Sequence, residues 1–153
     1  SRLYYPADQD CSEGECQSVT TARVGDSLTV RVTLNLQDPI HFLQVEDYIP
    51  AGTEVLNRSL KTSQLGLGEE TQTYRPDDPY LNGWGWWYFG SSQVYDDHVA
   101  WTAEYLPAGT YELTYTLVVN QPGVFQARPA RAWQIYFPEV QGISAGSLLE
   151  ILP

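Results

Sequence analysis

Two histidines, His41 and His98, are the side chains best suited to acid–base catalysis near neutral pH. Nucleophilic catalysis needs such a base beside a nucleophile, held in place by a third group. His98 directly follows Asp96 and Asp97, so a Ser–His–Asp set is conceivable. Neighbouring residues of a strand point to opposite faces, however, so we expect that Asp97 does not orient His98. Because the sequence also has no Gly-x-Ser-x-Gly turn, we predict no catalytic residue and no enzyme activity.

Adjacent carboxylates could bind a metal ion or act as an acid–base pair, and they occur at Glu69-Glu70, Asp77-Asp78 and Asp96-Asp97. Calcium takes about six to eight oxygen ligands from a shaped loop. None of the pairs has the spacing of a known calcium loop, and nothing in the sequence selects two carboxylates as a glycosidase pair. We therefore interpret them as solvated loop residues and predict no metal and no cofactor.

The two cysteines, Cys11 and Cys16, have four residues between them. Two thiols alone do not complete a structural zinc site. In an oxidising compartment they could instead close a small disulfide loop. We favour a Cys11–Cys16 disulfide over two free thiols, because the expected compartment, argued below, is an outer one.

The most aromatic part of the chain is Trp84-Gly85-Trp86-Trp87, followed by Tyr88 and Phe89. It lies in a long irregular segment, residues 61–95, and segments of this length are often functional. Three interpretations remain open. Alternate aromatic residues could cover the core or its edge, which we favour. Exposed Trp84, Trp86 and Trp87 could otherwise form a protein interface or a sugar-binding platform.

The composition excludes several classes of partner. The chain has 153 residues with 42% hydrophobic and 18% charged residues, which is typical of a globular protein with a substantial core. The net charge is −11 and the pI about 4.3, which argues against binding to nucleic acid or to anionic membranes. No stretch approaches the roughly 18 apolar residues of a membrane span. Methionine is absent and the chain opens on Ser1, so we expect one domain, residues 1–153, excised from a larger protein.

Strict alternation of apolar and polar residues predicts half-buried strands at residues 28–36, 99–105 and 111–117. In the second of these, Tyr105 falls on the same face as Val99, Trp101 and Ala103. One face of each strand should point to the core and the other to water, as in an antiparallel sheet. The predicted core residues are Val30, Val32, Leu34, Trp101, Tyr115 and Leu117.

Weaker strand signals fill the rest of the chain, separated by Gly- and Pro-containing turns. They cover Arg2–Tyr5, Gln17–Ala22, Ile40–Asp47, Glu54–Leu60, Trp86–Phe89, Gly123–Arg128, Ala132–Phe137 and Ser147–Leu152. No segment has a helical period. Many short strands at this spacing predict an all-β protein, a two-layer antiparallel β-sandwich that is immunoglobulin- or macroglobulin-like.

Five short motifs resemble, in order and spacing, the C-terminal macroglobulin-type domain of bacterial alpha-2-macroglobulins. They are VGDSLTVRV at 24–32, VEDYIPAGTE at 45–54, DDHV at 96–99, PAGTY at 107–111 and IYFPE at 135–139. The corresponding family patterns are VGD, xDxxPAGxE, DDRV, PGTY and MYxPE. His98 stands where the family usually has Arg, and Ile135 where it has Met. The resemblance extends from about Leu3 to Leu152.

The resemblance implies a part in a protease trap of the cell envelope, periplasm or extracellular space. In such traps a protease cuts a bait segment, the molecule rearranges, and a thioester in another domain captures the attacker. The thioester motif is Cys-x-Glu-Gln, whereas here Cys11-Ser12-Glu13 is followed by Gly14. This chain would therefore be a non-catalytic domain that packs on the thioester domain and neighbouring macroglobulin domains. It would meet target proteases only indirectly.

By the resemblance, an apolar residue of the segment at 135–139 shields the thioester from water, which assigns that role to Ile135 and Tyr136. In a regular strand Ile135 and Phe137 would share one face and Tyr136 the other. Pro138 cannot donate a ladder hydrogen bond and favours a strand end near Phe137. The alternatives are that Ile135 and Tyr136 pack the domain's own core, or that the domain is a carbohydrate-binding or adhesion sandwich using Trp84–Phe89.

Overall fold

The computed structural model of the chain describes residues 1–9, 16–56, 85–90 and 92–153, without the side chain of Trp86. The regular secondary structure of the described part consists of strands and one short 3-10 helix, η1 (Trp86–Tyr88). In chain order the strands are β1 (Arg2–Pro6), β2 (Thr21–Arg23), β3 (Ser27–Leu36), β4 (Ile40–Tyr48), β5 (Thr53–Val55), β6 (Gln93–Val94), β7 (His98–Leu106), β8 (Gly109–Val119), β9 (Gly123–Ala127), β10 (Arg131–Gln134), β11 (Gln141–Ile143) and β12 (Ser147–Leu152).

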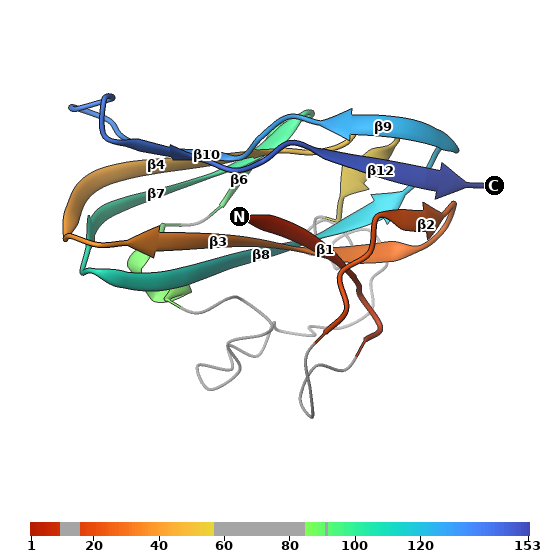
Figure 1. The fold of residues 1–153 in the computed structure, drawn as a ribbon, viewed down its shortest axis with the longest axis horizontal. Coiled ribbons are helices and arrows are strands. Elements are labelled where there is room, and N and C mark those ends of the chain that lie inside the picture. Colours follow the sequence, from red (N-terminus) through yellow and green to blue (C-terminus); the bar gives the residue numbers. More distant parts are fainter. Residues whose placement is uncertain (10–15, 57–84, 91) are drawn as a thin grey trace, which may run out of the picture.

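The strands form a two-layer sandwich, which confirms the predicted fold class (Figure 1). One layer is a four-stranded sheet of order β1-β3-β8-β5. The opposite layer consists of two sheets, β11-β10-β4-β7-β6 and β2-β12-β9. Every pairing is antiparallel except that of β2 with β12, which is parallel.

A long bent hairpin joins the two sheets of the second layer. Its inner part pairs β9 with β12 and its outer part pairs β10 with β11. The bend lies where Ala130 and Ser144 face each other, with the Ala130 amide donating to Ser144 Oγ and the Ser144 amide donating to the Ala130 carbonyl, both at 2.9 Å. The hairpin then ends in the connection between β10 and β11, residues 135–140, which we call the hairpin tip.

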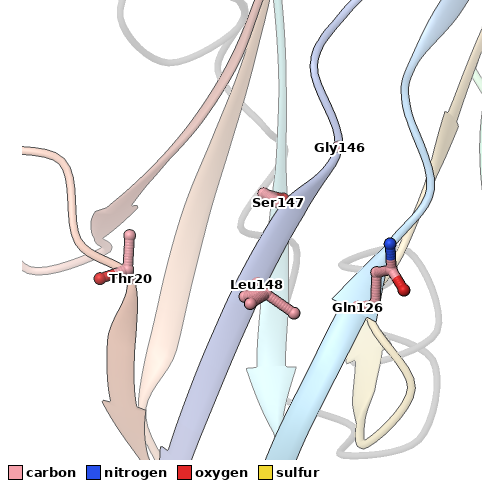
Figure 2. Close-up of a pocket in the computed structure, with 5 residues that line it drawn as sticks. All are labelled: Thr20, Gln126, Gly146, Ser147 and Leu148. Carbon is pink, nitrogen blue, oxygen red and sulfur yellow. The ribbon is translucent and has the colours of Figure 1, made fainter.

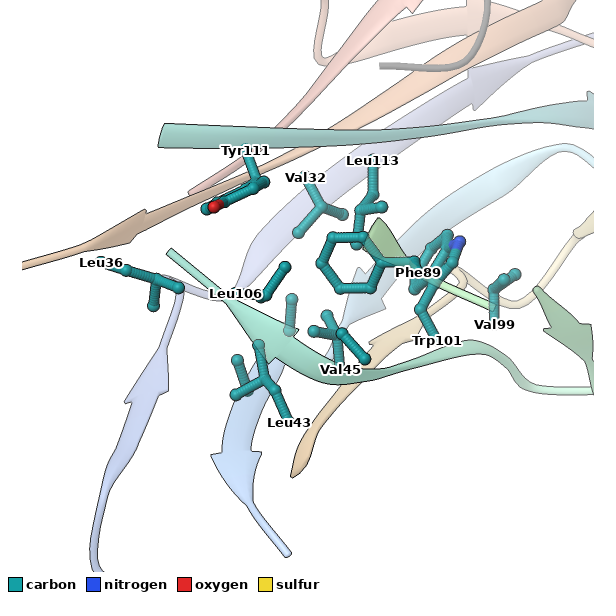
Figure 3. Packing of buried hydrophobic residues seen from close by; sticks show 13 residues of the cluster. Val32, Leu36, Leu43, Val45, Phe89, Val99, Trp101, Leu106, Tyr111 and Leu113 are labelled. Atoms are coloured by element: carbon teal, nitrogen blue, oxygen red, sulfur yellow. The ribbon is translucent and has the colours of Figure 1, made fainter. Parts of the chain in front are cut away.

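The inward faces of β3 and β8 cover both sheets of the opposite layer. Val32 and Leu113 pack against β4, β7 and β10, whereas Val30 and Leu117 pack against β2 and β12 (Figure 3 shows the first cluster). Of the predicted core residues, Val30, Val32, Trp101 and Leu117 are buried, and Leu34 and Tyr115 are partly buried against the core. The alternation in the sequence therefore identified the inward faces of both long strands.

We expect Val32→Ala to lower the free energy of unfolding by roughly 1–3 kcal/mol, scaled down from larger core truncations. Val32 is 4% exposed and lies between the two layers beside Leu113 (Figure 3). Urea unfolding measures the change. A loss of only a few tenths of a kcal/mol would mean that this face of β3 does not form the core.

The prediction that Tyr105 shares the core face of its strand is wrong. Tyr105 is 45% exposed and its ring lies 4.8 Å from that of His41. On β7 two successive residues point outward between the inward-facing Ala103 and Leu106. On β4 two successive residues also point outward, between Leu43 and Ile40, and Ile40 packs on the core. Both strands change face between the same pair of rungs, where Phe42 has the left-handed φ of 53°.

Four weaker strand predictions were also too long or of the wrong type. Trp86–Phe89 contains the helix η1 and no strand. The strand predicted at Gln17–Ala22 is only Thr21–Arg23, because Val19 instead donates its amide to the Tyr4 carbonyl. The strand predicted at Ala132–Phe137 ends at Gln134. That predicted at Glu54–Leu60 corresponds to Thr53–Val55, and residues 57–60 lie outside the described part.

A buried ion pair connects the layers at the bend of the hairpin. Arg2 Nη1 donates to Asp47 Oδ1 at 2.6 Å, and the two side chains are 1% and 0% exposed. The same guanidinium donates to the Arg128 carbonyl at 2.7 Å and to Ser147 Oγ at 2.8 Å. Tyr115 donates its hydroxyl to Asp47 Oδ2 at 2.7 Å. Burial, followed by the Asp47 charge, raises the pKa of Tyr115 well above its ordinary value, so the phenol stays a donor.

Candidate functional site

The hairpin tip is a tight turn closed by its own backbone. The Val140 amide donates to the Phe137 carbonyl at 2.9 Å, so residues 137–140 form a β-turn. Pro138 occupies the second position of this turn, where its fixed φ is favourable. At the end of β10, next to this turn, the Gln134 amide donates to the Val140 carbonyl at 3.0 Å and closes the hairpin.

The tip presents apolar side chains to solvent. Ile135 is 44%, Tyr136 69% and Phe137 59% exposed. The strand ends at Gln134, so the alternation of a strand does not apply to these residues and all three side chains project outward. Val140, on the far side of the turn, is 45% exposed. The tip is therefore not part of the domain's own core.

Phe42 contacts the base of the tip through both its backbone and its ring. Its carbonyl accepts a hydrogen bond from the Ile135 amide at 2.8 Å. Its ring meets that of Tyr136 edge-on, with centroids 5.2 Å apart and an interplanar angle of 86°. Phe42 is itself 44% exposed, so it extends the apolar surface of the tip onto β4. Sequence analysis did not single out Phe42, because nothing in its residue type marks a left-handed backbone.

The aromatic segment divides into buried and exposed side chains. Phe89 is 8% exposed and packs on Tyr111, with ring centroids 6.2 Å apart. Trp87 and Tyr88 are 46% and 39% exposed, and the Tyr88 ring meets Tyr111 edge-on. Trp87 and Phe89, one of the two alternate pairs that could have covered the core, do not share one face, because η1 replaces the strand. Trp84 lies outside the described residues, as does the side chain of Trp86.

The expectation that Asp97 does not orient His98 is also wrong. His98 Nδ1 lies 2.6 Å from Asp97 Oδ1, and this hydrogen bond is the main cause of the lowered pKa of Asp97. Asp97 belongs to the turn before β7, where the alternation of strand faces does not apply. The other groups in contact with the His98 ring are Tyr48 and Tyr95, whose centroids lie 5.3 Å and 4.4 Å away.

The remaining candidate sites are the cysteine pair and the adjacent carboxylates, and the described residues cover only part of them. Cys16 is disulfide-bonded, but Cys11 lies outside the described residues, so their pairing stays a prediction. Glu69-Glu70 and Asp77-Asp78 also lie outside them. Within the described ranges, no cluster of three or more His, Cys, Asp or Glu side chains could hold a metal ion. The same ranges contain no helix that is long and apolar enough to cross a membrane.

A shallow hollow of about 650 Å³ lies over β12, where the bent hairpin meets β2. Figure 2 shows its lining residues, which come from the start of β2, from β9 and from β12: Thr20, Gln126, Gly146, Ser147 and Leu148. None of these residues is ionisable. The hollow therefore has the hydrogen-bonding groups of a surface depression and no acid or base for catalysis.

The two-layer architecture is that of a macroglobulin-type, immunoglobulin-like β-sandwich. It superimposes on trypsin-activated alpha-2-macroglobulin from Escherichia coli with a TM-score of 0.74, at 20% identity, over 100% of this chain and 10% of that one. A native Escherichia coli structure from domain MG7 to the C-terminus gives a TM-score of 0.71, at 18% identity, over 100% of this chain and 23% of that one.

The sequence itself assigns the family. Residues 1–139 match the family described as the bacterial alpha-2-macroglobulin MG10 domain, and the chain belongs to this family. An alpha-2-macroglobulin homolog from Nostoc sp. is 25% identical over 125 residues, which is 82% of this chain and 6% of that protein. The chain thus spans a small fraction of the relatives that it matches. The matched range includes Ile135, Tyr136 and Phe137.

Proposed function

We propose that this domain is a non-catalytic part of a larger protease-trapping protein, in which the hairpin tip packs on the thioester domain and keeps water from the thioester. The observation that carries the proposal is the exposure of Ile135, Tyr136 and Phe137 together on a closed turn. Apolar groups gathered outside the core usually mark a contact with another surface. The occupant is a domain of the same parent chain, since every relative reported above is many times longer than this domain.

The chemistry of a thioester explains why such a surface is useful. A thioester is hydrolysed when water reaches it, so an apolar cover slows its hydrolysis until a protease cuts the bait segment. The cover must also separate when the trap rearranges, which requires a modest contact area. A turn with three large apolar side chains and a neighbouring carboxylate, Glu139, has this limited size. One of the Escherichia coli relatives is described as native and another as trypsin-activated, consistent with a molecule that changes state.

The proposed location is the periplasm, the cell envelope or the extracellular space. The disulfide at Cys16 supports an oxidising compartment. The net charge of −11 favours solubility and disfavours nucleic acid and anionic membrane surfaces as partners of this domain. Neighbouring macroglobulin domains and the thioester domain are the proposed direct partners, and target proteases the indirect ones.

Replacing Ile135 or Tyr136 with aspartate in the intact parent protein should accelerate reaction of the thioester with methylamine. A charged side chain at the contact brings water with it and weakens the cover. We expect about a tenfold faster reaction, which corresponds to about 1.4 kcal/mol of lost protection. The measurement is release of the free thiol over time.

Leu148→Asp is the matched control for this experiment. Leu148 is 59% exposed, the same as Phe137, but it lies on β12 in the other sheet of the layer. Its substitution should leave methylamine uptake at the parental rate. Parental rates in both Ile135→Asp and Tyr136→Asp would remove the shielding role, and so would an equal acceleration in Leu148→Asp.

The exposed Trp87 is the observation that favours the second candidate, a carbohydrate-binding or adhesion module. Sugar platforms use an open aromatic face, and Trp87 is tilted by 35° against Tyr88, so the two rings do not form one flat surface. Titration of the intrinsic tryptophan fluorescence with a panel of oligosaccharides separates the candidates. Saturable quenching that Trp87→Ala abolishes would support the sugar-binding function.

A further inference from the structure

Phe42 has the left-handed backbone conformation that bulky residues rarely adopt. Its φ is 53°, and it is the one non-glycine residue with a positive φ in the described part of the chain. A large side chain in this region is a genuine outlier, and such outliers persist only where surrounding contacts hold them. Phe42 is 44% exposed, so burial of its own ring in the core does not hold it there.

The left-handed turn of the backbone has a direct effect on the tip. Because the strand changes face at Phe42, both His41 and Phe42 point outward while Ile40 points to the core. The Phe42 carbonyl then accepts from the Ile135 amide at 2.8 Å, one residue beyond the last β4–β10 pair, Leu43 with Gln134. The same residue places its ring edge-on against Tyr136.

We infer that Phe42 is a positioning residue for the hairpin tip: its left-handed backbone and its ring hold Ile135 and Tyr136 in the outward arrangement that the neighbouring domain contacts. This inference rests on the proposed function for the identity of the partner. Its structural half, that Phe42 orders the tip, stands on contacts within this chain.

The tip depends on Phe42 because its other hydrogen bonds are internal. Gln134 with Val140, and Val140 with Phe137, close the turn but do not fix its direction relative to the sheet. The Phe42–Ile135 hydrogen bond and the Phe42–Tyr136 ring contact link β4 directly to the tip. Removing them leaves the turn intact and free to tilt about the end of β10.

Two substitutions separate the backbone from the ring. Valine is β-branched and strongly disfavours positive φ, so Phe42→Val should abolish the kink. Glycine adopts positive φ readily, so Phe42→Gly should keep the carbonyl in place and remove only the ring. In the 153-residue chain we expect the Ile135 amide to exchange with solvent at least about tenfold faster in Phe42→Val, which loses both the kink and the ring, and about two- to threefold faster in Phe42→Gly, which loses only the ring. Exchange of the Val45 amide in the middle of β4 reports whether the sheet is intact.

The outcomes distinguish this inference from the proposed function. Parental exchange of Ile135 in Phe42→Val, with Val45 also unchanged, overturns the positioning role. Faster exchange of Ile135 supports it, and faster methylamine uptake by Phe42→Val in the intact parent extends that support to the covering of the thioester. If Ile135 exchange rises while Tyr136→Asp leaves methylamine uptake unchanged, the positioning of the tip stands and the shielding function fails.

Discussion

Replacing Asp47 with asparagine is expected to lower the free energy of unfolding by about 3–5 kcal/mol, the cost of leaving a buried charge without its partner. Asp47 and Arg2 are 0% and 1% exposed at the side chain, so both charges are removed from solvent. Asparagine has nearly the same shape, so the loss reports on charge and not on a cavity. The substitution leaves the Arg2 guanidinium with carbonyl and hydroxyl acceptors only.

Glu112→Gln is the matched control for Asp47→Asn. Glu112 lies 3.8 Å from Arg31 in a partly exposed pair, and exposed pairs of this kind contribute about 0–1 kcal/mol. Urea unfolding of both variants at one pH gives the two losses. Equal losses, or a loss below about 1 kcal/mol for Asp47→Asn, would show that the buried pair is not what holds the bend of the hairpin.

The Arg2–Asp47 pair also shows what a sequence can and cannot indicate. Asp47 falls on the inward face that Leu43 and Val45 define, and an acidic residue in that register is a signal of a buried partner. The sequence could therefore have predicted that Asp47 is buried with a partner. The identity of the partner could not be found in this way, because Arg2 is 45 positions away and reaches Asp47 only after β1 is added to the edge of the first sheet.

The alternation of apolar and polar residues was sufficient to predict the buried face where a strand is regular. It predicted β3 and β8 along almost their whole length, because their inward residues face one continuous core. It failed where the backbone leaves the strand conformation. At Phe42 the inward and outward faces of β4 and β7 are exchanged, so Tyr105 points outward. Asp97 lies one residue before β7, so the alternation of strand faces does not apply to it.

The candidate site was found by resemblance and not by alternation. Ile135, Tyr136 and Phe137 look like the continuation of a strand in which alternate residues would face the core, and the early strand end at Gln134 turns all three outward. That end depends on the turn at Pro138 and on the carbonyl of Phe42, which belongs to a strand far away in the sequence. The exposure of the tip is thus a tertiary property of the fold.

Substituting Gly85 with alanine should lower the free energy of unfolding by about 2–4 kcal/mol, combining overpacking with a disfavoured backbone. Gly85 has a φ of 80°, and a methyl group there would overlap the Tyr111 ring. The ring cannot move aside easily: its hydroxyl donates to the Pro107 carbonyl at 2.7 Å, and Tyr88 and Phe89 pack on it edge-on.

Gly142→Ala tests whether this loss is specific to the Gly85 site. A methyl group at Gly142 meets nothing within 4 Å, so this variant should stay within about 0.5 kcal/mol of the parent. Tyr111 begins the inward row of β8 and belongs to the core cluster that contains Leu43 of β4, the residue next to Phe42, which contacts the tip. If Gly85→Ala unfolds at the parental urea concentration, η1 is only loosely attached to Tyr111. If it is destabilised as expected, the packing of η1 on Tyr111 helps to hold the end of the sandwich that carries the tip.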